Sequence, residues 1–211
     1  YDQRRLILGL IADPTSNQLA LSGKSLTAAE MMVFARYVMF SEVYWHKTVR
    51  SATAMLQSCV QQIPGSENIE SICSLSDNEA ENYILATTEA TALASDLFGP
   101  TRKLHKSVFQ CNASNNPDIY HRVAGLSYVE LIEASRRLQE LLKGGTTPDA
   151  VLIDAPPTQL EVQFDLNVYD KMTDSFSPLS ERSPVVRILA EEQFDYHVKR
   201  VRIFVRSEFT D

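Results

Sequence analysis

The residues best suited to chemistry in this sequence lie close together between Arg36 and Arg50. This stretch holds two arginines, the pair His46–Lys47 and several aromatic side chains inside an otherwise apolar segment. Burying such charge is costly unless it meets a partner, and an anionic ligand is one such partner. The stretch therefore predicts a site for an anion, with aromatic groups beside it.

On a continuous helix these groups would occupy defined faces. At about 100° per residue, Lys47 lies within about 20° of Arg36 around the helix. Tyr44 and His46 lie about 80° to either side of Arg36. One helix could therefore present groups to two different sites.

A single long helix is expected to carry these residues. Thr27 and Glu30 have the spacing of a capping box, and Ser25 is a second candidate for the cap. No glycine or proline follows until Pro64–Gly65, so the helix is predicted to run for about 35 residues. Residues 31–45, apolar nearly all round, are typical of a helix buried in the centre of a bundle.

The other elements follow from changes in hydrophobic period and from turn residues. Residues 3–8 are predicted to be helical, and residues 7–12 and 17–21 to form a hairpin. Further helices are predicted over 66–73, 77–86, 88–98, 127–143 and 182–194, the fourth opening with a capping box of Ser127 and Glu130. Strands are predicted over 103–111, 150–153, 160–168 and 199–206.

This order of elements predicts an α+β fold. A mainly helical lobe built on one long central helix is expected over residues 1–101, followed by a small α+β lobe over residues 102–211. In the last strand Val201, Ile203 and Val205 are expected to face inward. The neighbouring arginines, Arg200, Arg202 and Arg206, are expected on a solvated or interface face.

Composition excludes several classes of protein. Hydrophobic residues make up 44% of the chain and charged residues 22%, which is ordinary for a soluble globular protein. The net charge of −7 argues against a protein that coats nucleic acid, and no apolar stretch reaches the roughly 18 residues of a membrane span. The three widely spaced cysteines, Cys59, Cys73 and Cys111, indicate reduced thiols and a cytoplasmic location.

The chemistry-bearing helix resembles one in HD-domain dNTP triphosphohydrolases, including the sterile-alpha-motif-and-HD-domain enzymes and their bacterial relatives. Tyr44-Trp45-His46-Lys47 matches the Y-x-H-K signature of these enzymes, and Arg36 stands eight residues before its tyrosine. Weaker similarities flank it and cover essentially the whole chain in order. They are an F/Y-D-x-x-R motif at residues 1–5, an R-x-x-x-K strand at 102–106, and a C-terminal lobe that includes 151–154 and 184–205.

The resemblance implies roles for individual residues. Arg36 would contact the triphosphate of the substrate, and Tyr44 would pack on its sugar or base. Where nucleotide-activated members bind regulatory nucleotides between subunits of a homo-oligomer, this chain has Asp2, Arg5, Lys24, His46, Lys47, Arg102 and Lys106. Phe40, Ser22 and Ala28 depart from the pattern of the activated enzyme, which has a histidine at the first position and polar nucleotide contacts at the others.

No catalytic or metal-ligating residue is expected in this chain. HD enzymes hold a metal through an upstream histidine, a His-Asp dyad and a later aspartate, and the metal activates a water for attack on phosphorus. The four histidines of this chain include no His-Asp dipeptide. The start at Tyr1 indicates a portion of a larger protein, so a divalent metal is expected in the parent protein and the missing N-terminal HD segment is an expected partner.

Three interpretations remain open at this level. The first is the C-terminal portion of a metal-dependent HD-family phosphohydrolase acting on (deoxy)nucleoside triphosphates. The second is a non-catalytic nucleotide-binding or assembly module, and the third is an HD relative acting on other phosphoesters. Structural roles also compete for the single residues: snorkelling for Arg36 and Lys47, core packing for Tyr44, Trp45 and His46, and a solvent-facing strand for Arg102 and Lys106.

Overall fold

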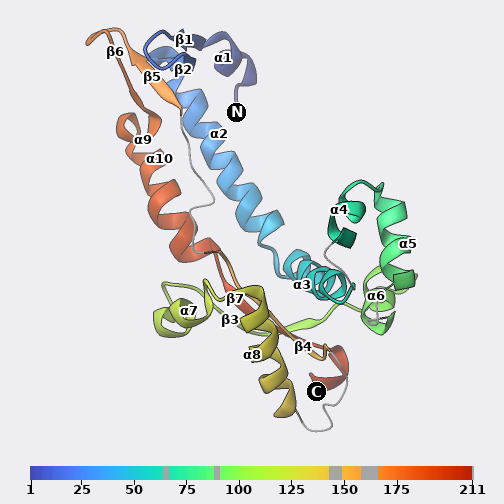
Figure 1. Ribbon diagram of the computed structural model, residues 1–211. Coiled ribbons are helices and arrows are strands. Elements are labelled where there is room, and N and C mark those ends of the chain that lie inside the picture. Colours follow the sequence, from blue (N-terminus) through green and yellow to red (C-terminus); the bar gives the residue numbers. More distant parts are fainter. Residues whose placement is uncertain (64–66, 88–90, 143–148, 158–165, 211) are drawn as a thin grey trace. The chain divides into compact units, whose positions relative to one another are not determined.

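The computed structural model describes residues 1–63, 67–87, 91–142, 149–157 and 166–210 (Figure 1). The chain forms two compact units that are interleaved in sequence. The first unit comprises Tyr1–Trp45, Asn112–Ser114 and Pro157–Lys199, and the second comprises His46–Cys111, Asn115–Pro156 and Arg200–Asp211. The predicted α+β class is confirmed, whereas the boundary proposed at residue 101 stays a prediction.

The first unit joins a four-stranded sheet to helices. Its sheet has the order β1-β2-β5-β6, in which β2 and β5 pair in parallel and the outer pairs are antiparallel hairpins. Leu21, Ala29, Val33, Val168 and Leu179 form its buried core. The elements are α1 (Gln3–Leu8), β1 (Leu10–Asp13), β2 (Gln18–Ser22), η1 (Gly23–Ser25), α2 (Leu26–Met39), η2 (Phe40–Tyr44), β5 (Asn167–Asp170), β6 (Ser175–Pro178), α9 (Leu179–Arg182), α10 (Pro184–Arg187) and η3 (Ile188–Val198).

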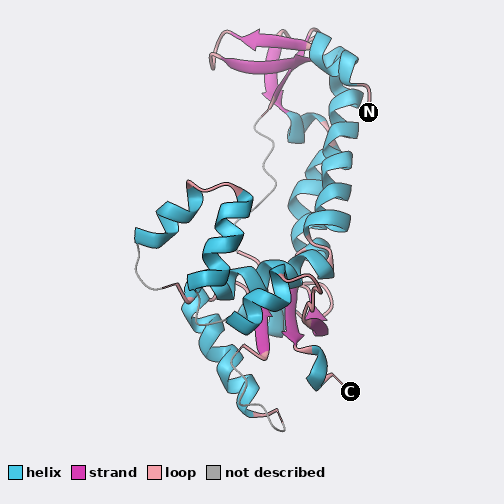
Figure 2. Cartoon of the chain, turned by 90° about the vertical axis from the view of Figure 1, so that its right-hand side faces the viewer, coloured by secondary structure: helices cyan, strands magenta, loops and turns pink. Residues whose placement is uncertain are grey.

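The second unit packs helices against both faces of a three-stranded antiparallel sheet of order β3-β7-β4. Met55, Cys59, Ala94, Leu152 and Phe204 belong to its core. Helices and strands are distinguished in Figure 2. The elements are α3 (Lys47–Gln61), α4 (Glu67–Cys73), α5 (Asp77–Thr87), α6 (Thr91–Phe98), β3 (Lys106–Cys111), α7 (Pro117–Val123), α8 (Tyr128–Glu140), β4 (Val151–Asp154), β7 (Val201–Val205) and η4 (Ser207–Phe209).

The prediction of one continuous helix is wrong. The helix α2 ends at Met39 and continues as the π-helix η2, where the Trp45 N–H donates to the Phe40 carbonyl five residues earlier, at 2.8 Å. His46 then has extended backbone, and its Nδ1 accepts from the Thr48 N–H at 3.3 Å to cap α3. A polar side chain that caps a new helix can end the preceding one without glycine or proline. The angles calculated between Arg36 and Lys47 on one helix therefore do not apply.

The expectation that residues 31–45 are buried all round is also wrong. Met31, Phe34 and Met39 are 48%, 47% and 45% exposed, whereas Val33 is buried. Because α2 packs against α1, α10 and η3 on one side, only one of its faces is covered within the unit.

Most other elements were predicted correctly. The N-terminal helix and hairpin, the strands near 103–111, 150–153 and 199–206, and the three helices between residues 66 and 98 are confirmed within the described residues. Ser127 and Glu130 form the reciprocal capping box at the start of α8. The helix near 182–194 is divided among α9, α10 and η3. The strand predicted over 160–168 lies mostly outside the described residues, and β5 begins at Asn167.

Asp13 fastens the β1–β2 turn to the neighbouring strand. Its buried carboxylate accepts from the Thr15 N–H at 2.8 Å, the Ser16 Oγ at 2.8 Å and the Asn167 Nδ2 at 3.2 Å. Burial raises the pKa of this carboxyl, but the hydrogen bonds made to its charged form outweigh burial and hold the pKa below its ordinary value.

The lowered pKa predicts acid sensitivity with a defined sign. The stability that Asp13 contributes is fully present above the unfolded carboxyl pKa of about 3.9 and is lost as the pH falls through the lower folded value. We expect Asp13→Asn to reduce the melting temperature at neutral pH and to flatten its fall below about pH 4. Circular dichroism melts across this range measure both effects, with Glu181→Gln, an exposed carboxyl of the same unit, as control. A wild type and Asp13→Asn that lose stability in parallel would contradict the assignment.

Candidate functional site

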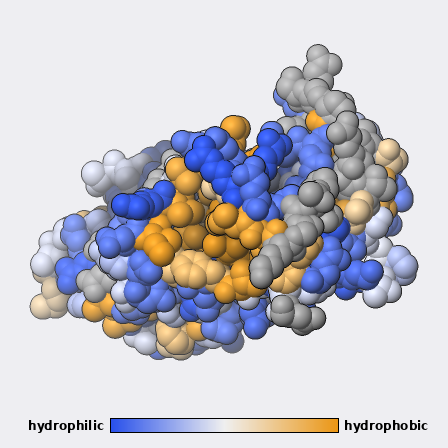
Figure 3. All heavy atoms as spheres, turned by 90° about the horizontal axis from the view of Figure 1, so that it is seen from below, coloured by the Kyte–Doolittle hydropathy of each residue, from blue (hydrophilic) through white to orange (hydrophobic). Residues whose placement is uncertain are grey.

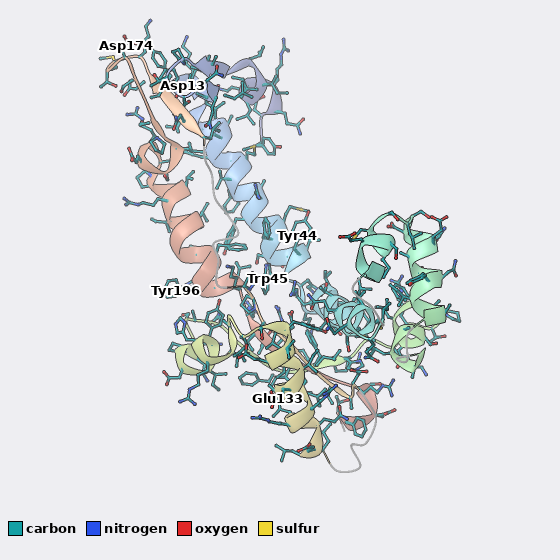
Figure 4. The ribbon with its side chains drawn as sticks, viewed as in Figure 1. Asp13, Tyr44, Trp45, Glu133, Asp174 and Tyr196 are labelled. Carbon is teal, nitrogen blue, oxygen red and sulfur yellow. The ribbon has the colours of Figure 1, made fainter. Side chains whose placement is uncertain are left out.

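A hollow of about 490 Å³ runs along α2 and η2 of the first unit. Both residues predicted to bind substrate, Arg36 and Tyr44, line it. Tyr44 is 52% exposed while its neighbour Trp45 is buried, and both side chains are marked in Figure 4. Trp45 is therefore a core residue, whereas about half of the Tyr44 side chain is open to solvent. The full lining is Tyr1, Met32, Ala35, Arg36, Met39, Phe40 and Tyr44.

The polar and aromatic members of this lining contact one another. The Arg36 Cζ lies 5.5 Å from the centroid of the Phe40 ring, which is a cation–π distance. The Phe40 ring lies 5.2 Å from that of Tyr44, with the planes at 56°. These three residues are spaced four apart, so they follow one another along the same side of the helix.

Arg36, Phe40 and Tyr44 form one wall of the hollow. This wall combines the planar, positively charged guanidinium of Arg36 with apolar and aromatic surface. A guanidinium is planar and matches two phosphate oxygens at once. Aromatic rings such as Tyr44 accept a sugar or a base by packing face to face or edge to face. The hollow can therefore hold an anion that carries a ring substituent.

Three of the residues predicted to bind a regulatory nucleotide are neighbours in the first unit. The Asp2 carboxylate accepts from the Arg5 N–H at 2.9 Å and caps α1. The Arg5 Nε donates to the Lys24 carbonyl at 3.1 Å, and the Ser25 Oγ donates to the Arg5 carbonyl at 3.0 Å. These bonds tie α1 to the turn before α2, and all three predicted side chains are exposed.

The other four, His46, Lys47, Arg102 and Lys106, belong to the second unit and are also exposed. His46 caps α3, so the alternative that it is a core histidine is wrong. Lys106 opens β3 opposite Val205. Binding of a regulatory nucleotide by any of these residues stays a prediction.

Sequence reasoning missed a buried charge cluster in the second unit. The Arg50 Nε donates to the Asp154 Oδ2 at 2.9 Å, and its Nη2 makes a second bond to the Oδ1. Arg202 lies directly opposite Asp154 in the β4–β7 register and is buried, so the solvated face expected for it is wrong. Burial lowers the pKa of Arg202 to about 10, with Asp154 opposing this shift and Arg200 and Arg50 adding to it. The sequence does carry a signal for this cluster, because Asp154 and Arg202 stand in two strands that are otherwise apolar.

A second buried network joins α3 to the residues before β4. The Asp149 carboxylate accepts from the Ser58 Oγ and the Gln62 Nε2, each at 2.9 Å, and the Asp149 carbonyl lies 2.8 Å from the His105 Nε2. Burial, with Asp149 beside them, raises the pKa of Cys59 and of Tyr128 to about 12. A thiol that stays protonated at neutral pH is a poor nucleophile.

An apolar groove of about 500 Å³ lies on one face of the second unit's sheet, where it is bordered by α7 and α8. Phe109, Ile153, Val201 and Ile203 form its floor. Figure 3 shows apolar side chains gathered in one area that hydrophilic residues surround. The charged residues that line this groove include Glu133 and Arg137, which pair with each other.

The described residues do not fit the metal centre of an HD enzyme. Among them, no three histidine, cysteine, aspartate or glutamate side chains come together as ligands for an ion.

Within the described ranges, no helix has both the length and the apolar character that crossing a membrane requires.

Comparison with known proteins relates the chain to one family and to solved folds. Residues 1–211 match the family described as HD associated region. A hypothetical protein from Aquifex aeolicus superposes with a TM-score of 0.64 and 21% identity, over 99% of this chain and 49% of that one. A phosphohydrolase from Bacteroides thetaiotaomicron gives 0.57 and 15%, over 96% and 55%. The chain thus spans about half the length of these two proteins, and at such identities the likeness is one of fold. No match was found among the curated proteins.

Proposed function

This chain belongs to the HD associated region family along its whole length, and from that premise we propose that it is the C-terminal portion of a metal-dependent HD phosphohydrolase acting on nucleoside triphosphates. Its part in the reaction is the substrate side of the site. The phosphohydrolase from Bacteroides thetaiotaomicron, which shares the fold, supports the general reaction class.

The observation that carries the proposal is the wall of Arg36, Phe40 and Tyr44 along one hollow. Phosphate recognition needs a cation with donors in a plane, and base or sugar recognition needs aromatic surface beside it. Both lie within two turns of one helical segment here. A nucleotide with its phosphates on Arg36 and its sugar or base on Tyr44 satisfies both.

The role of Arg36 is electrostatic. Its guanidinium orients the phosphoryl group and stabilises the negative charge that grows on the phosphate oxygens during attack by water. The divalent metal proposed for the parent protein would supply the activated water when bound. Since the described residues form no ligand set, its ligands are proposed to lie in an N-terminal HD segment.

We extend the proposal to regulation and assembly. A homo-oligomer in the cytoplasm would bind regulatory nucleotides between subunits through the exposed residues Asp2, Arg5, Lys24, His46, Lys47, Arg102 and Lys106. The hydrogen bonds that join Asp2, Arg5 and Lys24 support this proposal, because they hold three of these seven residues side by side.

A substrate panel tests the proposed activity. The whole protein, supplied with a divalent cation, is incubated with deoxynucleoside triphosphates, ribonucleoside triphosphates, phosphomonoesters and cyclic nucleotides, and products are separated by ion-exchange chromatography. We expect hydrolysis of nucleoside triphosphates at a kcat/KM at least about tenfold above the other classes, since only they offer both a polyphosphate and a base. Preference for another phosphoester would favour an HD relative of different substrate class. Saturable nucleotide binding without turnover would favour a binding module.

A further inference from the structure

Four side chains, each in contact with the next, form a row that is here called the ring ladder: Arg36, Phe40, Phe194 and Lys199. Arg36 is its exposed end. The Arg36 Cζ lies 5.5 Å from the Phe40 centroid, and Phe40 meets Phe194 edge to face at 5.1 Å and 86°. The Lys199 Nζ lies 6.0 Å from the Phe194 centroid. The ladder brings together η2 and η3, two segments of the first unit about 150 residues apart in sequence.

The inner end of the ladder is fixed by burial. Phe194 is 1% exposed and packs with Trp45 and Val198 in a small apolar cluster that Phe40 also contacts. Lys199 is buried too, and its Nζ donates to the Pro157 carbonyl at 3.3 Å. Buried rings that interlock edge to face have few alternative rotamers. Phe40 therefore has a defined orientation although its own ring is only half-buried.

The π-helix η2 ends in two adjacent residues with different surroundings, Tyr44 in the hollow and Trp45 in the core. It begins at Phe40, whose carbonyl accepts from the Trp45 N–H. Trp45 is buried in the cluster around Phe194, while Tyr44 stays half-exposed in the hollow. Such single π turns are frequently found at functional sites.

We propose that Phe40 is a positioning residue: its ring holds the Arg36 guanidinium against the wall of the hollow in the orientation that binds phosphate. An arginine side chain has many rotamers, and ordering it on binding costs entropy. A cation–π contact with Phe40 uses none of the guanidinium N–H donors as hydrogen bonds, so they remain available to an oxyanion. This inference rests on the proposed function, because the phosphate that Arg36 is held to bind is that of the proposed substrate.

A double-mutant cycle in the whole protein tests it. We expect Phe40→Leu, which keeps an apolar side chain but removes the ring, to lower kcat/KM for nucleoside triphosphates about 5- to 30-fold. Phe40→Trp should restore activity to within about threefold of wild type. In an Arg36→Ala background Phe40→Leu should add less than about twofold, because its effect acts through the arginine. Phe34→Leu, an exposed phenylalanine of α2 that does not line the hollow, is the matched control.

A second measurement does not depend on turnover. In spectra that resolve arginine side chains, the Arg36 δ-methylene protons should carry a ring-current shift that Phe40→Leu abolishes and Phe34→Leu preserves. Retention of that shift in Phe40→Leu would overturn the inference. So would an unchanged kcat/KM in Phe40→Leu while Arg36→Ala is impaired, and the proposed function would stand. An unimpaired Arg36→Ala would instead overturn the proposed function, and the positioning role with it.

Discussion

Arg36→Ala is expected to lower kcat/KM for nucleoside triphosphates about 100- to 1,000-fold in the whole protein, the loss typical when one preorganised donor to a developing oxyanion is removed. The hollow that Arg36 lines offers aromatic and apolar surface on its other sides. Because Arg36 is exposed, the variant should fold normally, and its melting temperature should stay close to that of wild type. Steady-state kinetics measure the loss of kcat/KM, and thermal melts show whether any of that loss comes from reduced stability.

Two further arginine variants test whether the loss of kcat/KM is specific to the guanidinium of Arg36. Arg36→Lys keeps the charge but loses the fork that binds two oxygens, so it should recover only part of the activity. Arg187→Ala removes an exposed arginine of the same unit that does not line the hollow, and it should leave kcat/KM within about twofold of wild type. Equal activity of Arg36→Ala and Arg187→Ala would exclude a substrate role for Arg36.

The largest effect on stability is expected from Asp154→Asn. Asp154 is 2% exposed, accepts two hydrogen bonds from Arg50 and lies opposite the buried Arg202. Removing its charge takes a buried carboxylate from beside two guanidinium groups, which costs about 3–5 kcal/mol. For a chain of this size that corresponds to a melting temperature lower by about 6–20 °C.

Differential scanning calorimetry checks this prediction. Glu133→Gln makes the same change of charge at an exposed i,i+4 pair with Arg137, and it should cost less than about 0.5 kcal/mol. Comparable losses in the two variants would show that the buried cluster contributes no more than a surface ion pair.

Local interactions explain which elements could be predicted. The capping box of Ser127 and Glu130, the turn after Asp13 and the apolar strands of the second unit each depend on residues close together in sequence. Those patterns were sufficient to predict the α+β class and most element positions. The charged and aromatic residues between Arg36 and Arg50 are likewise close together in sequence, so the sequence alone predicted an anion site on this segment, and that site stays a prediction.

Tertiary packing decided the rest, because its contacts join residues that no local pattern connects. The predicted long helix is interrupted at Trp45, whose indole is buried with Phe194, about 150 residues away, and His46 caps the helix that follows. Arg202 is buried rather than solvated, and the Asp154 opposite it on the sheet is bound by Arg50 of α3. The sequence alone predicted which side chains could bear chemistry, whereas only the fold determined that Arg36, Phe40 and Tyr44 line one hollow, since the free energy of burial depends on the partners that folding supplies.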